Sequence, residues 1–199
     1  MTFARRQRRQ LLDAMHTAGP LAPTACEGWL VQDLAAHLWV REHRLSALPG
    51  IGAPRFAART QRLQMEGLHR LGFEGLLEKL ERPGWVMRLV DPLVNGAEFY
   101  LHLEDVLRPR HEHAELSRSD QEYLRRIALL MARKTQLGKP YRLVVTPTDG
   151  HAKSYGGGEQ VVYVEGAPNE LLLHFSGRDA DVVITADDEP AYRASIAGL

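Results

Sequence analysis

The chain has 199 residues, of which 44% are hydrophobic, and its 25 basic and 25 acidic side chains give a net charge of zero. This is the composition of an ordinary globular protein, and the neutral balance argues against a dedicated nucleic-acid or anionic-membrane binder. The single cysteine, Cys26, excludes an intrachain disulfide, and the lack of a signal peptide or a long apolar run predicts a soluble cytoplasmic protein with no membrane partner.

The first 138 residues have the periodicity of helices. Apolar residues recur at three- and four-residue intervals, and Gly-Pro or Pro-Gly pairs separate most of the segments. The predicted helices are Arg5–Ala18, Val31–Ala47, residues 56–70, a short extra helix Phe73–Leu80, Pro92–Leu107 and Ser117–Gln136. We therefore expect an all-α bundle up to about Gly138.

The remaining residues have a different pattern. Tyr141–Thr146 and Gln160–Glu165 are β-branched runs that we predict to be strands joined by a hairpin turn at Gly156–Gly158. Asp181–Thr185 is a third predicted strand, Glu170–Phe175 fits either a strand or a short helix, and Glu189–Ala197 fits a helix. The predicted fold is thus α+β with two domains, a helical bundle over residues 1–138 and a small α+β domain over residues 139–199.

Glu98 and His102 are the first candidates for chemistry. A spacing of four residues places their side chains on one face of the predicted helix Pro92–Leu107. A carboxylate and an imidazole on one face can bind the same divalent cation, although such a pair is also common on helix surfaces. A useful metal site needs a third ligand from another element.

His37 is the best candidate for that third ligand. It lies between Leu34 and Leu38 on the apolar stripe of the second predicted helix, where its ring needs either a hydrogen bond or a metal. Inward side chains from facing helices are the usual way to build a metal site in a bundle. Spacing alone leaves open a metal site or a set of hydrogen-bonded core residues, but in the second case Glu98 would be a buried charge without compensation.

Two segments carry a resemblance to a known family. Gly28–Leu38, with its Asp-Leu-x-x-His motif, and Asn95–Val106, with its Glu-x-x-x-His motif, resemble the metal-binding domain of mycothiol-dependent maleylpyruvate isomerase, a DinB-like bundle. Gly166–Arg178 resembles the small sterol-carrier-like α+β domain of the same proteins. The resemblance implies an up-down bundle of four main helices plus an extra helix, followed by that small domain.

The resemblance also implies a site and a reaction. The family's motif histidine, glutamate and second histidine correspond to His37, Glu98 and His102, and the family ion is zinc, with nickel or another divalent ion as an alternative. Leu30 and Leu103 depart from the family pattern, in which a threonine and a further histidine are common. The implied activity is a thiol-dependent isomerase or S-transferase, in which the metal activates mycothiol or another small thiol against an electrophilic substrate.

Other residues are candidates for supporting roles. Asp105 and Asp33 are placed to orient the ligand histidines, although both residue types also cap helices. Arg178 could bind a carboxylate of substrate or cofactor and is the candidate catalytic residue, with a surface arginine as the plainer interpretation. Cys26 has no obvious base nearby in sequence and is not expected to be reactive.

Three functions remain open from the sequence. The first is the thiol-dependent enzyme, acting on small molecules as a monomer or homodimer. The second is a non-catalytic protein that binds a metal or small ligand in a regulatory or stress role. The third, a purely structural bundle, ranks last because it leaves the charge of Glu98 without a partner.

Overall fold

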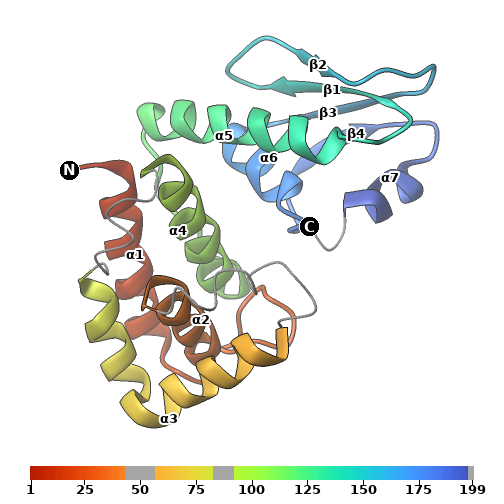
Figure 1. Ribbon diagram of the computed structural model, residues 1–199. Helices are drawn as coiled ribbons and strands as arrows, with labels where there is room; N and C mark the ends of the chain where they lie inside the picture. Colours follow the sequence, from red (N-terminus) through yellow and green to blue (C-terminus); the bar gives the residue numbers. More distant parts are fainter. Residues whose placement is uncertain (44–56, 83–91, 197–199) are drawn as a thin grey trace. The chain divides into compact units, whose positions relative to one another are not determined.

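The computed structural model describes residues 1–43, 57–82 and 92–196, and these form an α+β protein, as predicted (Figure 1). In the described residues, no helix has both the length and the apolar character needed to cross a membrane. The elements in chain order are α1 (Phe3–Ala18), α2 (Val31–His43), α3 (Ala57–Glu81), α4 (Pro92–Leu107), the 3-10 turn η4 (Arg108–Arg110), α5 (Arg118–Gln136), β1 (Arg142–Pro147), β2 (Lys153–Tyr155), β3 (Val161–Gly166), α6 (Pro168–Phe175), β4 (Val182–Thr185) and α7 (Glu189–Ile196).

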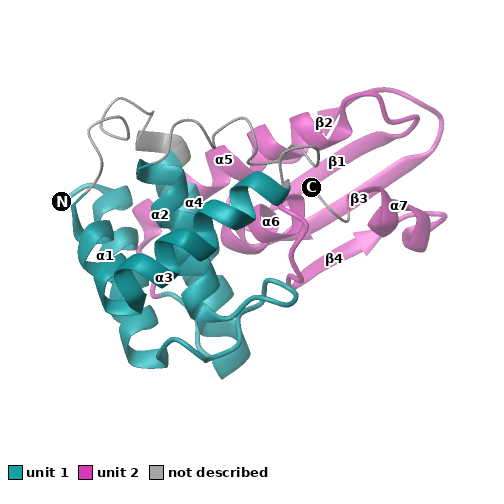
Figure 2. Cartoon of the chain, turned by 60° about the horizontal axis from the view of Figure 1, so that its bottom comes forward, with its two compact units in different colours: residues 1–114 teal, residues 115–199 magenta. Residues whose placement is uncertain are grey.

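The chain divides into two compact units, residues 1–114 and residues 115–199 (Figure 2). This division differs from the boundary near Gly138 that the change of periodicity predicts. The difference is helix α5, which the sequence pattern groups with the preceding helices. In the structure α5 packs against α6 and strands β1 and β2, so it belongs to the second unit.

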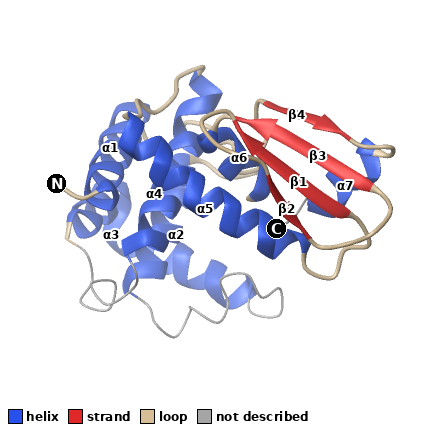
Figure 3. Cartoon of the chain, turned by 90° about the horizontal axis from the view of Figure 1, so that it is seen from above, coloured by secondary structure: helices blue, strands red, loops and turns tan. Residues whose placement is uncertain are grey.

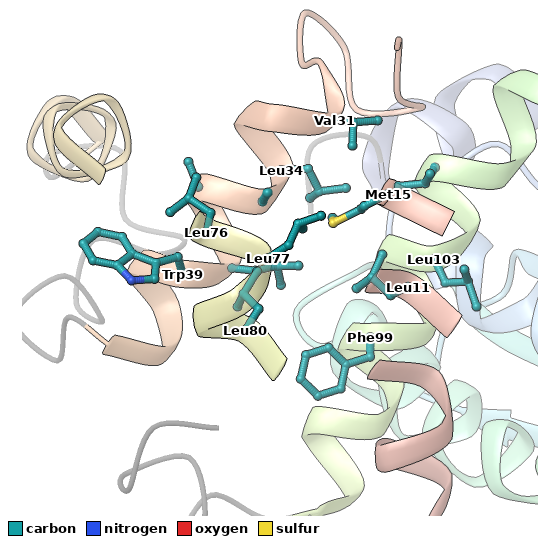
Figure 4. Packing of buried hydrophobic residues seen from close by; sticks show 14 of the residues in the cluster. Leu11, Met15, Val31, Leu34, Trp39, Leu76, Leu77, Leu80, Phe99 and Leu103 are labelled. Atoms are coloured by element: carbon teal, nitrogen blue, oxygen red, sulfur yellow. The ribbon is translucent and has the colours of Figure 1, made fainter. Parts of the chain in front are cut away.

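The first unit is built from two pairs of helices, with α1 packed along α4 and α2 along α3. One apolar cluster joins all four helices, and Figure 4 shows side chains from each of them pointing into it. Its members include Leu11 and Met15 from α1, Val31, Leu34 and Trp39 from α2, Leu76, Leu77 and Leu80 from α3, and Phe99 and Leu103 from α4. This core holds α2 and α4, the helices that carry the predicted ligands.

Helix α3 contains a kink that accounts for two of the predicted segments. Gly72 has φ +67° and ψ 176°, a backbone conformation that glycine adopts without steric strain. The predicted helices 56–70 and Phe73–Leu80 correspond to the two sides of this kink. The predicted extension of the second helix from residue 44 to Ala47 lies outside the described residues.

The second unit contains a four-stranded sheet in the order β2-β1-β3-β4 (Figure 3). Strand β1 is antiparallel to β2 and parallel to β3, and β4 is antiparallel to β3. Helices α5 and α6 both pack on the sheet, against alternate side chains that are buried, such as Leu143, Val145, Val162 and Val164. Glu170–Phe175 is helical because Pro168 begins α6 at a position where a missing N–H costs nothing.

The predicted hairpin turn at Gly156–Gly158 is wrong. The two β-branched runs form the parallel pair β1 and β3, and the hairpin partner of β1 is the short strand β2, which the sequence pattern did not predict. The glycines instead carry the chain past the start of β1. At Gly158, where φ is +129°, a Cβ atom would lie 2.3 Å from the carbonyl oxygen of Pro140, so only glycine fits this crossing.

Ser117→Ala is expected to destabilise the second unit by about 1 kcal/mol. Ser117 is the N-cap of α5, where its side chain accepts a hydrogen bond from the backbone N–H of Asp120 and the Asp120 carboxylate accepts one from the backbone N–H of Ser117. The alanine variant loses one half of this capping box. Urea denaturation measures the change, and an unchanged midpoint would contradict the assigned cap.

Candidate metal centre

The three predicted ligands lie together in the first unit. His37 comes from α2, and Glu98 and His102 come from successive turns of α4. Each offers a ligand atom, and these atoms all lie within 4.8 Å of one another. The Nε2 atom of His102 is 3.6 Å from Oε1 of Glu98, and the rings of His37 and His102 meet edge to face with centroids 5.5 Å apart.

Asp105 lies behind His102, on the side away from Glu98. Its Oδ2 atom is 2.9 Å from Nδ1 of His102, and the Asp105 carboxylate is almost completely buried. A carboxylate that accepts the Nδ1 proton fixes the ring and leaves Nε2 to face the cluster. Of the two supporting aspartates suggested by the sequence, Asp105 contacts a candidate ligand, whereas Asp33 accepts a hydrogen bond from the backbone N–H of Leu30 at the start of α2.

Cys26 also contacts this arrangement, which the sequence did not predict. Its thiol donates to Oδ2 of Asp105 over 3.3 Å. The loop that carries Cys26 is held to α4 by a hydrogen bond from the backbone N–H of Ala25 to the backbone carbonyl of Asp105. Cys26, His102 and Asp105 form a second group whose ligand atoms are close enough for a cation, sharing His102 with the first group.

The protonation states follow from burial and neighbouring charges. Burial lowers the pKa of His37 to about 4, with the charge of His102 acting in the same direction, so this ring is a neutral donor near pH 7. Burial alone would raise the pKa of Glu98. The hydrogen bond to His102 and the charge of Arg41 have the larger effect and lower this pKa to about 2. Burial lowers the pKa of His102, yet its hydrogen bonds to Asp105, Cys26 and Glu98 raise it to about 10.

With these protonation states, Nε2 of His102 carries a proton at the position where a metal would bind. Without a metal, the His102 ring is an imidazolium between the carboxylates of Glu98 and Asp105. A metal at Nε2 therefore has to displace that proton, which couples binding to pH.

Arg41 also contacts the cluster, and the sequence pattern did not single it out. Its Nε atom lies 3.0 Å from Oε1 of Glu98, and the arginine side chain is almost completely buried. The argument that Glu98 would be uncompensated without a metal is therefore wrong, because Arg41 already supplies a positive charge. Its position, one helical turn after His37, was a signal that could have revealed it.

The donor set fits a divalent ion. Ligand atoms about 2.0–2.1 Å from a tetrahedral zinc lie roughly 3.3 Å from one another, so the cluster needs only a small closure around an ion. His37 also has a partner for its other nitrogen, since the amide nitrogen of Gln64 lies 3.3 Å from Nδ1. With the amide turned over, its oxygen accepts a hydrogen bond from Nδ1–H and leaves Nε2 for a metal. Two imidazoles and one carboxylate are the ligands of catalytic zinc sites that keep an open position.

The candidate catalytic residue Arg178 lies in the second unit, after α6. Its guanidinium donates to the backbone carbonyl of Ser176 over 3.2 Å. This contact fits a residue that stabilises the turn following α6. A role for Arg178 in binding a carboxylate stays a prediction.

Together the fold and the cluster define a class: an α+β protein whose helical unit holds a His/Glu/His group suited to a divalent metal. Two crystal structures of mycothiol-dependent maleylpyruvate isomerase, one of them a histidine-to-alanine mutant, are similar to this chain. They cover 93% of this chain and 90% of their own, with TM-scores of 0.59 and 0.58. The sequence identities are 15% and 16%, so the similarity establishes a shared fold.

Neither the known family models nor the curated protein sequences give a significant match to the chain. The relationship to the isomerase therefore rests on the fold, and the chemistry has to be argued from this chain's own residues.

Proposed function

We propose that His37, Glu98 and His102 bind one divalent metal ion, with zinc as the first choice, and that the protein is a thiol-dependent isomerase or S-transferase. The observation that carries the proposal is the convergence of these three side chains, with Asp105 hydrogen-bonded behind His102. A metal bound there would lower the pKa of a thiol at its open position and so supply a nucleophile at neutral pH.

The surrounding residues support this chemistry in separate ways. Asp105 holds the Nδ1 proton of His102, which directs Nε2 toward the other two ligands. Arg41 keeps Glu98 anionic, as a metal ligand must be. Trp29 packs beside His37, with ring centroids 5.2 Å apart, and restricts its orientation. The similar crystal structures are of an isomerase that depends on mycothiol, which makes a low-molecular-weight thiol the natural co-substrate to test.

The test is turnover that requires both a metal and a thiol. Protein purified without an affinity tag is analysed for bound metal and then assayed for cis–trans isomerisation of maleylpyruvate with and without mycothiol. We expect turnover that depends on the thiol, is lost with a chelator and returns with Zn²⁺. Metal binding without turnover on this or other electrophilic substrates would favour the non-catalytic metal-binding protein, and absence of metal binding would overturn the proposal.

A further inference from the structure

Arg41 is a buried cation at the edge of the candidate metal centre. Only 7% of the residue is exposed. Two of its nitrogens have partners on α4: Nε pairs with Oε1 of Glu98, and Nη2 donates to Oδ1 of Asn95, each over 3.0 Å. Both contacts lie along one edge of the guanidinium.

The third nitrogen of Arg41, Nη1, is buried and has no hydrogen-bond acceptor within the part of the chain that the structure describes. A buried donor without a partner is unfavourable, and more so when the group is charged. Such an atom is expected where a ligand supplies the missing acceptor.

The charge balance of the loaded site points to the same kind of ligand. The two positive charges of a divalent ion are offset by Glu98 and Asp105, while His37 and His102 bind as neutral rings. With Arg41 included, these described groups then carry one positive charge in excess. A site with one excess positive charge and low solvent exposure favours an anionic ligand.

We propose that Arg41 binds a carboxylate on the ligand that occupies the open metal position. The inference rests on the proposed metal centre and adds its substrate class, small molecules that carry a carboxylate near their metal-binding group. Because Nε is 3.0 Å from Glu98, the geometry of the guanidinium places Nη1 within about 5.5 Å of that metal ligand. A carboxylate one or two bonds from the metal-binding atom spans this distance.

The test compares two thiols that differ in one group. The protein is loaded with Co²⁺, and mercaptoacetate or 2-mercaptoethanol is titrated while the sulfur-to-cobalt charge-transfer absorption is followed. We expect mercaptoacetate to bind at least about tenfold more tightly, since a hydrogen bond to a charged group contributes about 1.5–3 kcal/mol. Arg41→Gln should remove this preference, whereas Arg108→Gln, which affects an arginine paired with Glu104, should keep it.

A second variant tests the same inference if Arg41→Gln does not fold. Asn95→Asp keeps Arg41 in place and puts a permanent carboxylate beside Nη2, so it should also abolish the preference. Equal binding of the two thiols by Co²⁺-loaded wild type would overturn this inference and leave the metal centre intact. A wild-type protein that binds no Co²⁺ would instead overturn the proposed function, and the carboxylate site with it.

Discussion

His37→Ala is expected to lower the affinity for Zn²⁺ by roughly a thousandfold, because it removes one of three protein ligands. His37 is the sole candidate ligand from α2 within the described residues, so the variant leaves only the Glu98 and His102 pair on α4. Metal analysis of untagged protein measures the loss of bound ion. Competition with a chromogenic chelator gives the change in affinity.

His43→Ala is the matched control for this variant. His43 lies on the same helix, but its Nδ1 atom is 3.2 Å from the backbone carbonyl of Trp39 and its ring stacks on the Trp39 indole. We expect unchanged metal content from this control. Equal metal content in wild type and His37→Ala would show that His37 is not a ligand.

Glu98 is a less suitable first target, although it is equally central to the site. Its removal would leave Arg41 buried without its anion, and breaking a buried pair in this way destabilises a protein by about 3–5 kcal/mol. A loss of metal in Glu98→Ala would therefore mix the loss of a ligand with damage to the fold. In the described part of the chain His37 makes no ion pair, and its contacts are with Gln64, Trp29 and the His102 ring.

Local patterns predicted most of the fold. The helices follow the spacing of apolar residues, and the change to β-branched runs after Gly138 marks the start of the sheet. The pattern could not predict how these elements pack. Helix α5 is amphipathic like the helices before it, and its membership of the second unit follows from contacts with α6 and β1 that have no local signature.

The predicted hairpin between the two β-branched runs, which form β1 and β3, failed for the same reason. A glycine run between two β-branched segments is typical of a hairpin. Strand β2 is too short and too polar to be recognised as a strand from the sequence. In the structure β2 is the antiparallel partner of β1, and the chain passes the Pro140 carbonyl at Gly158 before it pairs with β1 in parallel as β3. This path depends on contacts in three dimensions that the local pattern does not contain.

The sequence predicted the part of the candidate site whose residues lie on helices. Spacing alone placed Glu98 and His102 together and put His37 on an inward face, and the same rule applied one turn further would have found Arg41. Cys26 could not be found in this way, because it approaches Asp105 from a loop far away in sequence.

Asp105→Asn is expected to weaken Zn²⁺ binding by about tenfold to a hundredfold, although it changes no ligand. The Asp105 carboxylate accepts the Nδ1 proton of His102 and makes that ring a better donor, and the amide is a weaker acceptor of the same size. Affinity measured by chelator competition at fixed pH reports the effect.

Asp33→Asn distinguishes this role from a general effect on the helices. Asp33 also lies on the helix of a candidate ligand, four residues before His37, yet its carboxylate accepts a hydrogen bond from the backbone N–H of Leu30 at the start of α2. The variant should lower the stability of the helix by about 0.5–1 kcal/mol and leave the Zn²⁺ affinity unchanged. If both variants weakened metal binding equally, the effect of Asp105 would come from stability rather than from its hydrogen bond to His102, since only Asp105 contacts a candidate ligand.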